Sequence, residues 1–262
     1  MRAIWTGSLS FGLINIPVRL YSGSESRGGI ELNMLHKDDL SPIRYAKICR
    51  KDGQEVPYDD IVKGYEYQDG DYVVLTDADF DKVNSRKTKT IDIEEFTDEQ
   101  ELDVRYYEKP YYLEPDKNSE KPYALLREAL KRSHKIAVAK FVLRQREHLA
   151  AIKPVGRALV LNQLRFPSDL REPRQLDLPD AKIATGKEID MALKLIDQLT
   201  GPFVPEDYKD SYTEELEAMI EAKLKGKAPK AEGKAPSATP AKDLMAMLKE
   251  SLEKEKAKTT GK

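Results

Sequence analysis

The sequence contains a single cysteine, Cys49, among 262 residues. A disulfide framework needs paired cysteines, so the disulfide-stabilised secreted scaffolds are excluded, and a lone thiol is typical of a reducing compartment. No apolar run approaches the roughly 18 residues that a membrane-spanning helix needs. The segment from Met1 to Ser8 reaches polar side chains too early for the apolar core of a signal peptide. We therefore expect a cytoplasmic protein without a membrane partner.

Recognisable catalytic motifs are also missing. The chain has three histidines far apart in sequence, and it has neither a nucleophile elbow nor a glycine-rich dinucleotide turn. Gly186-Lys187-Glu188 lacks the hydroxyl residue with which a P-loop binds magnesium. Arg50-Lys51-Asp52-Gly53 resembles the K-x-D-G motif of nucleotidyltransferases, but Arg50 replaces the lysine and a guanidinium cannot act as the covalent nucleophile. The sequence thus predicts neither an enzyme nor a cofactor.

One stretch has the spacing of a zinc knuckle pair. His36 and Asp39, followed by Cys49 and Asp52, occupy the four ligand positions. Structural zinc strongly prefers Cys and His, and two carboxylates would weaken the site. We interpret the stretch as a metal-free hairpin whose lysines and arginines remain available to phosphates.

Charge is present in quantity but unevenly distributed. Charged residues make up 34% of the chain, and the net charge is only −2. Residues 52–116 carry 20 Asp and Glu against 7 Lys and Arg, whereas residues 121–174 carry 13 Lys and Arg against 4 Asp and Glu. Residues 223–262 are again basic, with 11 Lys against 5 acidic residues. This segregation predicts a positive surface beside a negative one, and hence an acidic partner such as nucleic acid.

Most of the chain has the pattern of short strands. Ile14, Ile16, Val18 and Leu20 alternate with polar residues or proline, which indicates a half-buried strand. Further strands are predicted at 71–75, 90–96, 104–113, 136–143, 148–153 and 157–166, with a turn at Val155-Gly156. Many short antiparallel strands indicate a β-barrel or a sandwich.

Helices are predicted between and after these strands. Ser119 begins a helix to about Ser133, and the capping box Thr185-Gly186-Lys187-Glu188 begins a second one that ends at Gly201-Pro202. A third has apolar residues every four positions from Tyr208 to Leu224. The second and third helices need an apolar surface to cover, which is either their own barrel or a second subunit. Residues 226–242 have the composition of a disordered linker, and a short amphipathic helix with a flexible basic tail is predicted at 243–262.

Several blocks of this sequence closely resemble bacterial Ku proteins. The resemblance covers about residues 1–225. The matching blocks are Arg2 to Val18 (RAIWTGSLSFGLINIPV), Leu35 to Asp38 with Asp52-Gly53, Lys63 to Tyr67, Tyr111 to Pro115, Leu159 to Arg165, and Met191 to Leu199.

The resemblance implies a mainly β fold with some α: a Ku-type barrel core with an extended bridge at 1–184 and a C-terminal helical arm at 185–225. It also implies a ring-shaped homodimer that encircles the end of double-stranded DNA in non-homologous end joining. The ring would protect the end and recruit the multifunctional ATP-dependent ligase of that pathway, and a nucleoid-associated cytoplasmic protein is expected.

A protein that serves any break must contact phosphates rather than base edges, and Lys and Arg provide such contacts. The candidate DNA-binding residues are Lys37, Arg44, Arg50, Lys51, Lys131, Arg132, Arg144, Arg146, Lys153, Arg157 and Arg165. The candidate partner-binding residues in the last helix are Leu244, Met247, Leu248 and Leu252, although this helix could instead dock on its own domain. Two alternatives remain: a lyase that uses a lysine at damaged ends, and a general adaptor whose basic tail binds acidic partners.

Overall fold

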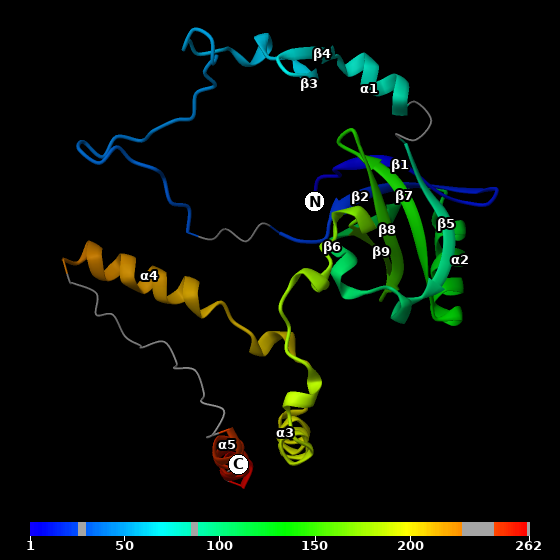
Figure 1. The fold of residues 1–262 in the computed structure, drawn as a ribbon. Helices are drawn as coiled ribbons and strands as arrows, with labels where there is room; N and C mark the ends of the chain where they lie inside the picture. The colour runs from blue at the N-terminus through cyan, green and yellow to red at the C-terminus, as the bar shows by residue number, and fades with distance from the viewer. Residues whose placement is uncertain (26–29, 85–88, 227–243, 261–262) are drawn as a thin grey trace. The chain divides into compact units, whose positions relative to one another are not determined.

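The computed structural model describes residues 1–25, 30–84, 89–226 and 244–260. The chain divides into two compact units, one of Met1–Arg27 with Asn33–Glu172 and the other of Gly28–Leu32 with Pro173–Lys262. The first unit contains a closed seven-stranded barrel and an inserted arm, and the second contains helices (Figure 1). None of the described helices has the length and apolarity needed to cross a bilayer.

The barrel has the strand order β1-β2-β6-β9-β8-β7-β5. Its strands are β1 (Trp5–Phe11), β2 (Ile14–Ser22), β5 (Thr90–Asp98), β6 (Tyr107–Pro115), β7 (Lys135–Leu143), β8 (Arg146–Val155) and β9 (Ala158–Leu164). Neighbouring strands are antiparallel, except that β1 and β5 pair in parallel and thereby close the barrel. The predicted barrel class is confirmed.

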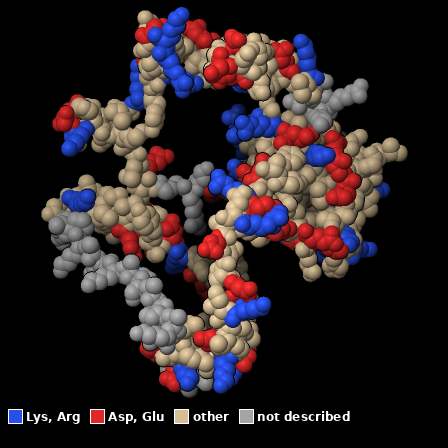
Figure 2. Space-filling view, viewed as in Figure 1, with Lys and Arg blue, Asp and Glu red and all other residues tan. Residues whose placement is uncertain are grey.

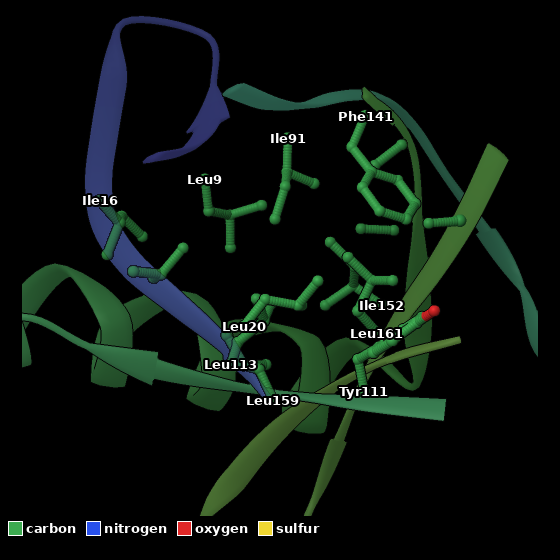
Figure 3. Close-up of a cluster of buried hydrophobic side chains, with 14 of the residues drawn as sticks. Leu9, Ile16, Leu20, Ile91, Tyr111, Leu113, Phe141, Ile152, Leu159 and Leu161 are labelled. Carbon is green, nitrogen blue, oxygen red and sulfur yellow. The ribbon is translucent and has the colours of Figure 1, made fainter. Parts of the chain in front are cut away.

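The core lies inside this barrel. Alternate residues of every strand point inward, among them Leu9, Ile16, Ile91 and Phe141 (Figure 3). Helix α2 (Glu120–Ser133) adds its buried face to the same cluster through Tyr123, Leu126 and Leu130. Each such side chain, when fully buried, contributes roughly 1.5–3 kcal/mol. The helix therefore belongs to the barrel and closes its core.

The strands predicted from alternation are present, with small shifts at their ends. Two strands were missed, and both contain glycine. In β1, a Cβ on Gly7 would lie 2.3 Å from the Trp5 ring and 2.3 Å from the Lys89 carbonyl oxygen, so only glycine fits. In the predicted strand at 104–113, the first residues instead form a 3₁₀ turn at Val104–Tyr106, because the Asp103 carboxylate accepts the Arg105 N–H.

The arm lies between β2 and β5 in sequence. It contains two small loops closed by the bridges Leu35–Pro42 and Ile48–Glu55, the hairpin β3 (Lys63–Gln68) and β4 (Asp71–Leu75), and helix α1 (Asp77–Asn84). None of its described residues is buried. The arm thus has no core of its own.

The second unit contains α3 (Gly186–Leu199), α4 (Ser211–Leu224) and α5 (Leu244–Thr260). The predicted capping box is present, because Glu188 accepts the Thr185 N–H at 2.8 Å. Helix α4 starts later than Tyr208, since Asp210 caps it by accepting the Thr213 N–H at 3.1 Å. The predicted linker at 226–242 lies, but for Gly226, outside the described residues.

Helix α5 packs on α3, with Gln198 Nε2 donating to the Leu252 carbonyl oxygen at 3.4 Å. It also continues to Thr260, past the three turns expected. Lys254 pairs with Glu250 one turn earlier at 2.7 Å, and such i,i+4 pairs favour the helix over the flexible tail that was predicted. The remaining short helical turns are 3₁₀ segments at Tyr58–Asp60, Glu99–Glu101, Pro167–Asp169, Pro173–Gln175, Ala181–Ile183 and Pro205–Asp207.

Candidate nucleic-acid interface

Acidic and basic segments that are separate in sequence lie next to each other in the barrel. The acidic segment supplies β5 and β6, which flank the strands β7 to β9 of the basic segment. Ion pairs across these boundaries join Lys135 to Asp98 at 2.7 Å, Lys140 to Glu94 at 3.7 Å, and Lys153 to Glu99. Acidic and basic side chains are intermixed on the visible face of the barrel (Figure 2). The acidic strands therefore border the basic strands directly and form ion pairs with them, and a separate positive surface stays a prediction.

Three of the predicted DNA-binding residues have partners within the protein. Lys153 pairs with Glu99, and Arg44 pairs with Glu55 at 3.1 Å. Arg165 donates to the carbonyl oxygen of Tyr107 at 2.7 Å, and so joins β9 to β6. These contacts reduce the positive charge that the three side chains can offer to a phosphate.

The other eight predicted residues are exposed and have no ion-pair partner within the described part of the chain. They are Lys37, Arg50, Lys51, Lys131, Arg132, Arg144, Arg146 and Arg157. All lie at turns or at a helix end, where long side chains can extend from the surface. Their charges are the ones most available for phosphate contacts.

These eight residues form three groups rather than one. Lys37, Arg50 and Lys51 lie on the two loops of the arm. Lys131 and Arg132 end α2 at the same end of the barrel as Arg157, because α2 leads into the start of β7, which pairs with the end of β8. Arg144 lies at the opposite end, in the β7–β8 turn, and Arg146 follows that turn as the first residue of β8.

The first arm loop is held by a carboxylate. Asp39 Oδ1 accepts the Ser41 N–H at 3.0 Å and lies 3.0 Å from His36 Nδ1. These hydrogen bonds, that from the Ser41 N–H foremost, lower the pKa of Asp39 below its ordinary value. His36 and Asp39, two residues of the knuckle spacing, are thus hydrogen-bonded to each other.

The second arm loop repeats this arrangement. Asp52 Oδ1 accepts the Gln54 N–H at 3.1 Å, and this bond, together with one from the Cys49 side chain, lowers the pKa of Asp52. Among the described residues, no group of three or more His, Cys, Asp or Glu side chains is placed to hold a metal ion. Hydrogen bonds within each loop therefore account for the knuckle spacing.

The predicted partner-binding residues of α5 divide into two pairs. Leu248 and Leu252 are partly buried, on the face that packs on α3. Leu244 and Met247 remain 38% and 46% exposed. Helix α5 thus packs on α3 and at the same time keeps exposed apolar side chains.

One polar residue at the β7–β8 turn, Gln145, was not predicted. Gln145 adopts a left-handed conformation, and its side chain contacts Lys63 of the arm. A neutral residue at a turn matches no charge pattern or motif, so the sequence alone gave no signal for it.

A closed barrel with an inserted arm, and with exposed cations that have no ion-pair partner among the described residues, has the features of a β-barrel binding protein. The family model described as the Ku70/Ku80 beta-barrel domain matches residues 10–191. The chain belongs to this Ku family.

Relatives of similar length support the assignment. The chain is 45% identical to the non-homologous end joining protein Ku of Opitutus terrae, covering 96% of this chain and 91% of that protein. It is 42% identical to the protein of that name from Archaeoglobus fulgidus, covering 87% and 90%. It is 37% identical to the one from Bacillus subtilis, covering 97% and 82%.

Proposed function

We propose that this protein binds the ends of double-stranded DNA, without regard to sequence, in non-homologous end joining. The observation that carries this proposal is the set of eight exposed cations at or beside turns and at the end of α2, which have no acidic partner within the described residues. Cations on flexible side chains neutralise phosphates and release counterions, and such contacts contain no sequence information. Names of the relatives point to the same pathway.

The binding unit in this proposal is a homodimer. The arm exposes large apolar side chains along its whole length, including Tyr65, Tyr72, Val73 and Val74, each at least 49% exposed. An isolated two-stranded hairpin is marginally stable in water. A second copy of the chain would cover these surfaces and would close a ring around the duplex. Such a ring admits a linear end and excludes an intact circle.

The same proposal assigns α5 to recruitment of the multifunctional ATP-dependent ligase. Leu244 and Met247 are the two apolar residues of the predicted set that α3 leaves more exposed. Amphipathic helices commonly bind partner grooves through such residues, and methionine adapts to irregular surfaces.

A gel shift that compares linear with covalently closed duplex of the same sequence, over a salt series, tests the proposal. We expect strong binding to the linear form, little to the closed form, and an affinity that falls steeply with salt. Equal binding to both forms would overturn end recognition. Binding that persists unchanged at high salt would overturn the phosphate-contact mechanism.

A further inference from the structure

We propose that Gln145 is a positioning residue that fastens the arm to the barrel beside Arg144 and Arg146. This inference rests on the proposed function, because it takes these two arginines to contact DNA. Gln145 lies in the two-residue turn between β7 and β8, and the pair Leu143–Arg146 closes that turn.

The side chain of Gln145 contacts two residues of the arm. Its Oε1 accepts from Lys63 Nζ at 2.9 Å, and its Nε2 donates to Asp77 Oδ1 at 3.3 Å. Lys63 Nζ also lies 3.7 Å from Asp77 Oδ1. The amide of Gln145 thus hydrogen-bonds to both members of an existing ion pair, accepting from the lysine and donating to the aspartate.

The two arm residues are placed to hold the hairpin as a whole. Lys63 is the first residue of β3 and pairs with Leu75, the last residue of β4. Asp77 begins α1 two residues later. Lys63 Nζ further lies 4.8 Å from the centre of the Phe80 ring, in α1. One amide of the barrel therefore contacts the point where β3, β4 and α1 meet.

Side-chain contacts matter here because backbone packing is sparse. Within the described chain, β3, β4 and α1 make no extended packing contact with a barrel strand. None of the described residues of the arm is buried. A small number of polar contacts can then decide how freely the arm moves relative to Arg144 and Arg146.

The backbone of the turn supports a role beyond closing the hairpin. Arg144 has φ 52° and Gln145 has φ 64°, both left-handed. Two-residue turns of this kind favour glycine at the second position, since side chains are strained there. Here glutamine occupies that position, and its side chain makes the two contacts with the arm. Backbone strain of this kind persists where the surrounding contacts hold the residue in place, often at functional sites.

Replacement of Gln145 by glycine separates the two roles. Gln145→Gly relieves the turn and removes both contacts with the arm, without changing the charge of the protein. If Gln145 served only the hairpin, glycine would leave arm mobility and DNA binding unchanged. If it positions the arm, glycine frees the arm while the barrel stays at least as stable.

The test uses the full-length chain with a fluorophore on Cys49, the only cysteine, which lies in the arm. Time-resolved anisotropy without DNA measures arm mobility, thermal unfolding measures stability, and titration with linear duplex measures affinity. Asn118→Gly is the matched control, because Asn118 also has a positive φ of 76° but lies in the loop before α2.

We expect Gln145→Gly to keep the melting temperature, to increase the fast anisotropy decay at Cys49, and to weaken duplex binding about fivefold, the effect of one net hydrogen bond. Asn118→Gly should change neither mobility nor affinity. Unchanged mobility in Gln145→Gly would overturn the inference, and so would raised mobility with unchanged affinity. If the wild-type chain binds no DNA ends, the proposed function fails, whereas the mobility result still tests the contact itself.

Discussion

At the scale of single residues, Tyr123 shows how one hydroxyl connects three elements. It lies on α2 and is 5% exposed. Its hydroxyl donates to the Leu113 carbonyl of β6 at 2.7 Å and accepts the Leu159 N–H of β9 at 2.7 Å. Burial raises the pKa of this phenol, so it remains a neutral donor.

We expect Tyr123→Phe to destabilise the protein by about 1–3 kcal/mol, because two buried backbone groups lose their partner. Urea unfolding measures the change. Tyr112→Phe is the control, since Tyr112 is 39% exposed, and it should alter stability by less than about 0.5 kcal/mol. Equal effects of the two substitutions would show that the buried hydroxyl contributes nothing specific.

The arm loops should depend on pH through Asp39 and Asp52. Both carboxyls have a pKa below the ordinary 3.8 in the folded protein. A lowered pKa means that the ionised form stabilises the loop above pH 3.8 and that this stabilisation is lost as pH falls through the folded-state pKa.

We therefore expect the amide resonances of Ser41 and Gln54 in NMR spectra to stay constant down to about pH 4 and to shift below it. In Asp39→Asn the shift at Ser41 should disappear while that at Gln54 remains. A titration of either amide centred above pH 3.8 would contradict the hydrogen bonds assigned to these loops.

At the scale of elements, the sequence predicted the strands and helices whose apolar residues recur with a regular period. The run from Ile136 to Leu143 became β7 with a shift of one residue, and Thr185 and Glu188 began α3 as expected. Strand β1 was missed, although Trp5, Leu9 and Phe11 alternate, because Gly7 interrupts the pattern. That glycine is required by the Trp5 ring, a tertiary contact that periodicity does not record.

The candidate site was predicted in part, for a related reason. The list of Lys and Arg residues came from composition, and eight of its eleven members are exposed without an ion-pair partner in the described chain. The ion pair between Lys153 and Glu99, which makes Lys153 less available to a phosphate, could not be predicted from the sequence. It depends on the tertiary fold, which brings β8 close to the 3₁₀ turn after β5, where Glu99 lies 54 residues away in sequence.

This distinction between paired and unpaired cations gives a test on the β7–β8 turn. Arg144→Ala with Arg146→Ala should weaken binding to linear duplex and should reduce the slope of log affinity against log salt by about 1.8, if each arginine neutralises one phosphate. Lys140→Ala and Lys153→Ala, whose lysines pair with Glu94 and Glu99, serve as a control with the same loss of charge.

The control pair should change the salt slope by clearly less than the turn variant. Filter binding at four or more salt concentrations resolves the difference. Equal changes of slope would show that the overall charge of the protein, rather than the position of unpaired cations, sets its affinity for DNA.

At the scale of the whole molecule, the C-terminal segment should be separable from end binding. A chain that ends at residue 225 loses α5 together with the lysine-rich residues before it. We expect this truncation to keep its preference for linear duplex but to stimulate the ATP-dependent ligase less, or to release DNA sooner. Ligation assays and competition with unlabelled duplex measure the two effects. Full ligase stimulation together with unchanged DNA retention would refute this assignment.

Dimer formation should be visible as a dependence of stability on concentration. In addition to the apolar side chains of the arm, Ile189, Leu193 and Ile196 of α3 are 46–59% exposed and available to a second copy of the chain. When a partner binds only the folded chain, mass action raises the melting temperature with protein concentration. We expect light scattering to give about twice the 29.8 kDa of the single chain. Leu193→Lys with Ile196→Lys should reduce that mass to one chain, because charges would be buried in the interface.

Val155→Lys is the control, at a turn of the barrel where the side chain is 51% exposed. It should keep both the dimeric mass and the concentration-dependent melting. A monomeric wild type whose melting temperature is constant over a hundredfold range of concentration would contradict the dimer. It would also remove the ring as the explanation of end recognition, because the proposed ring consists of two copies of the chain.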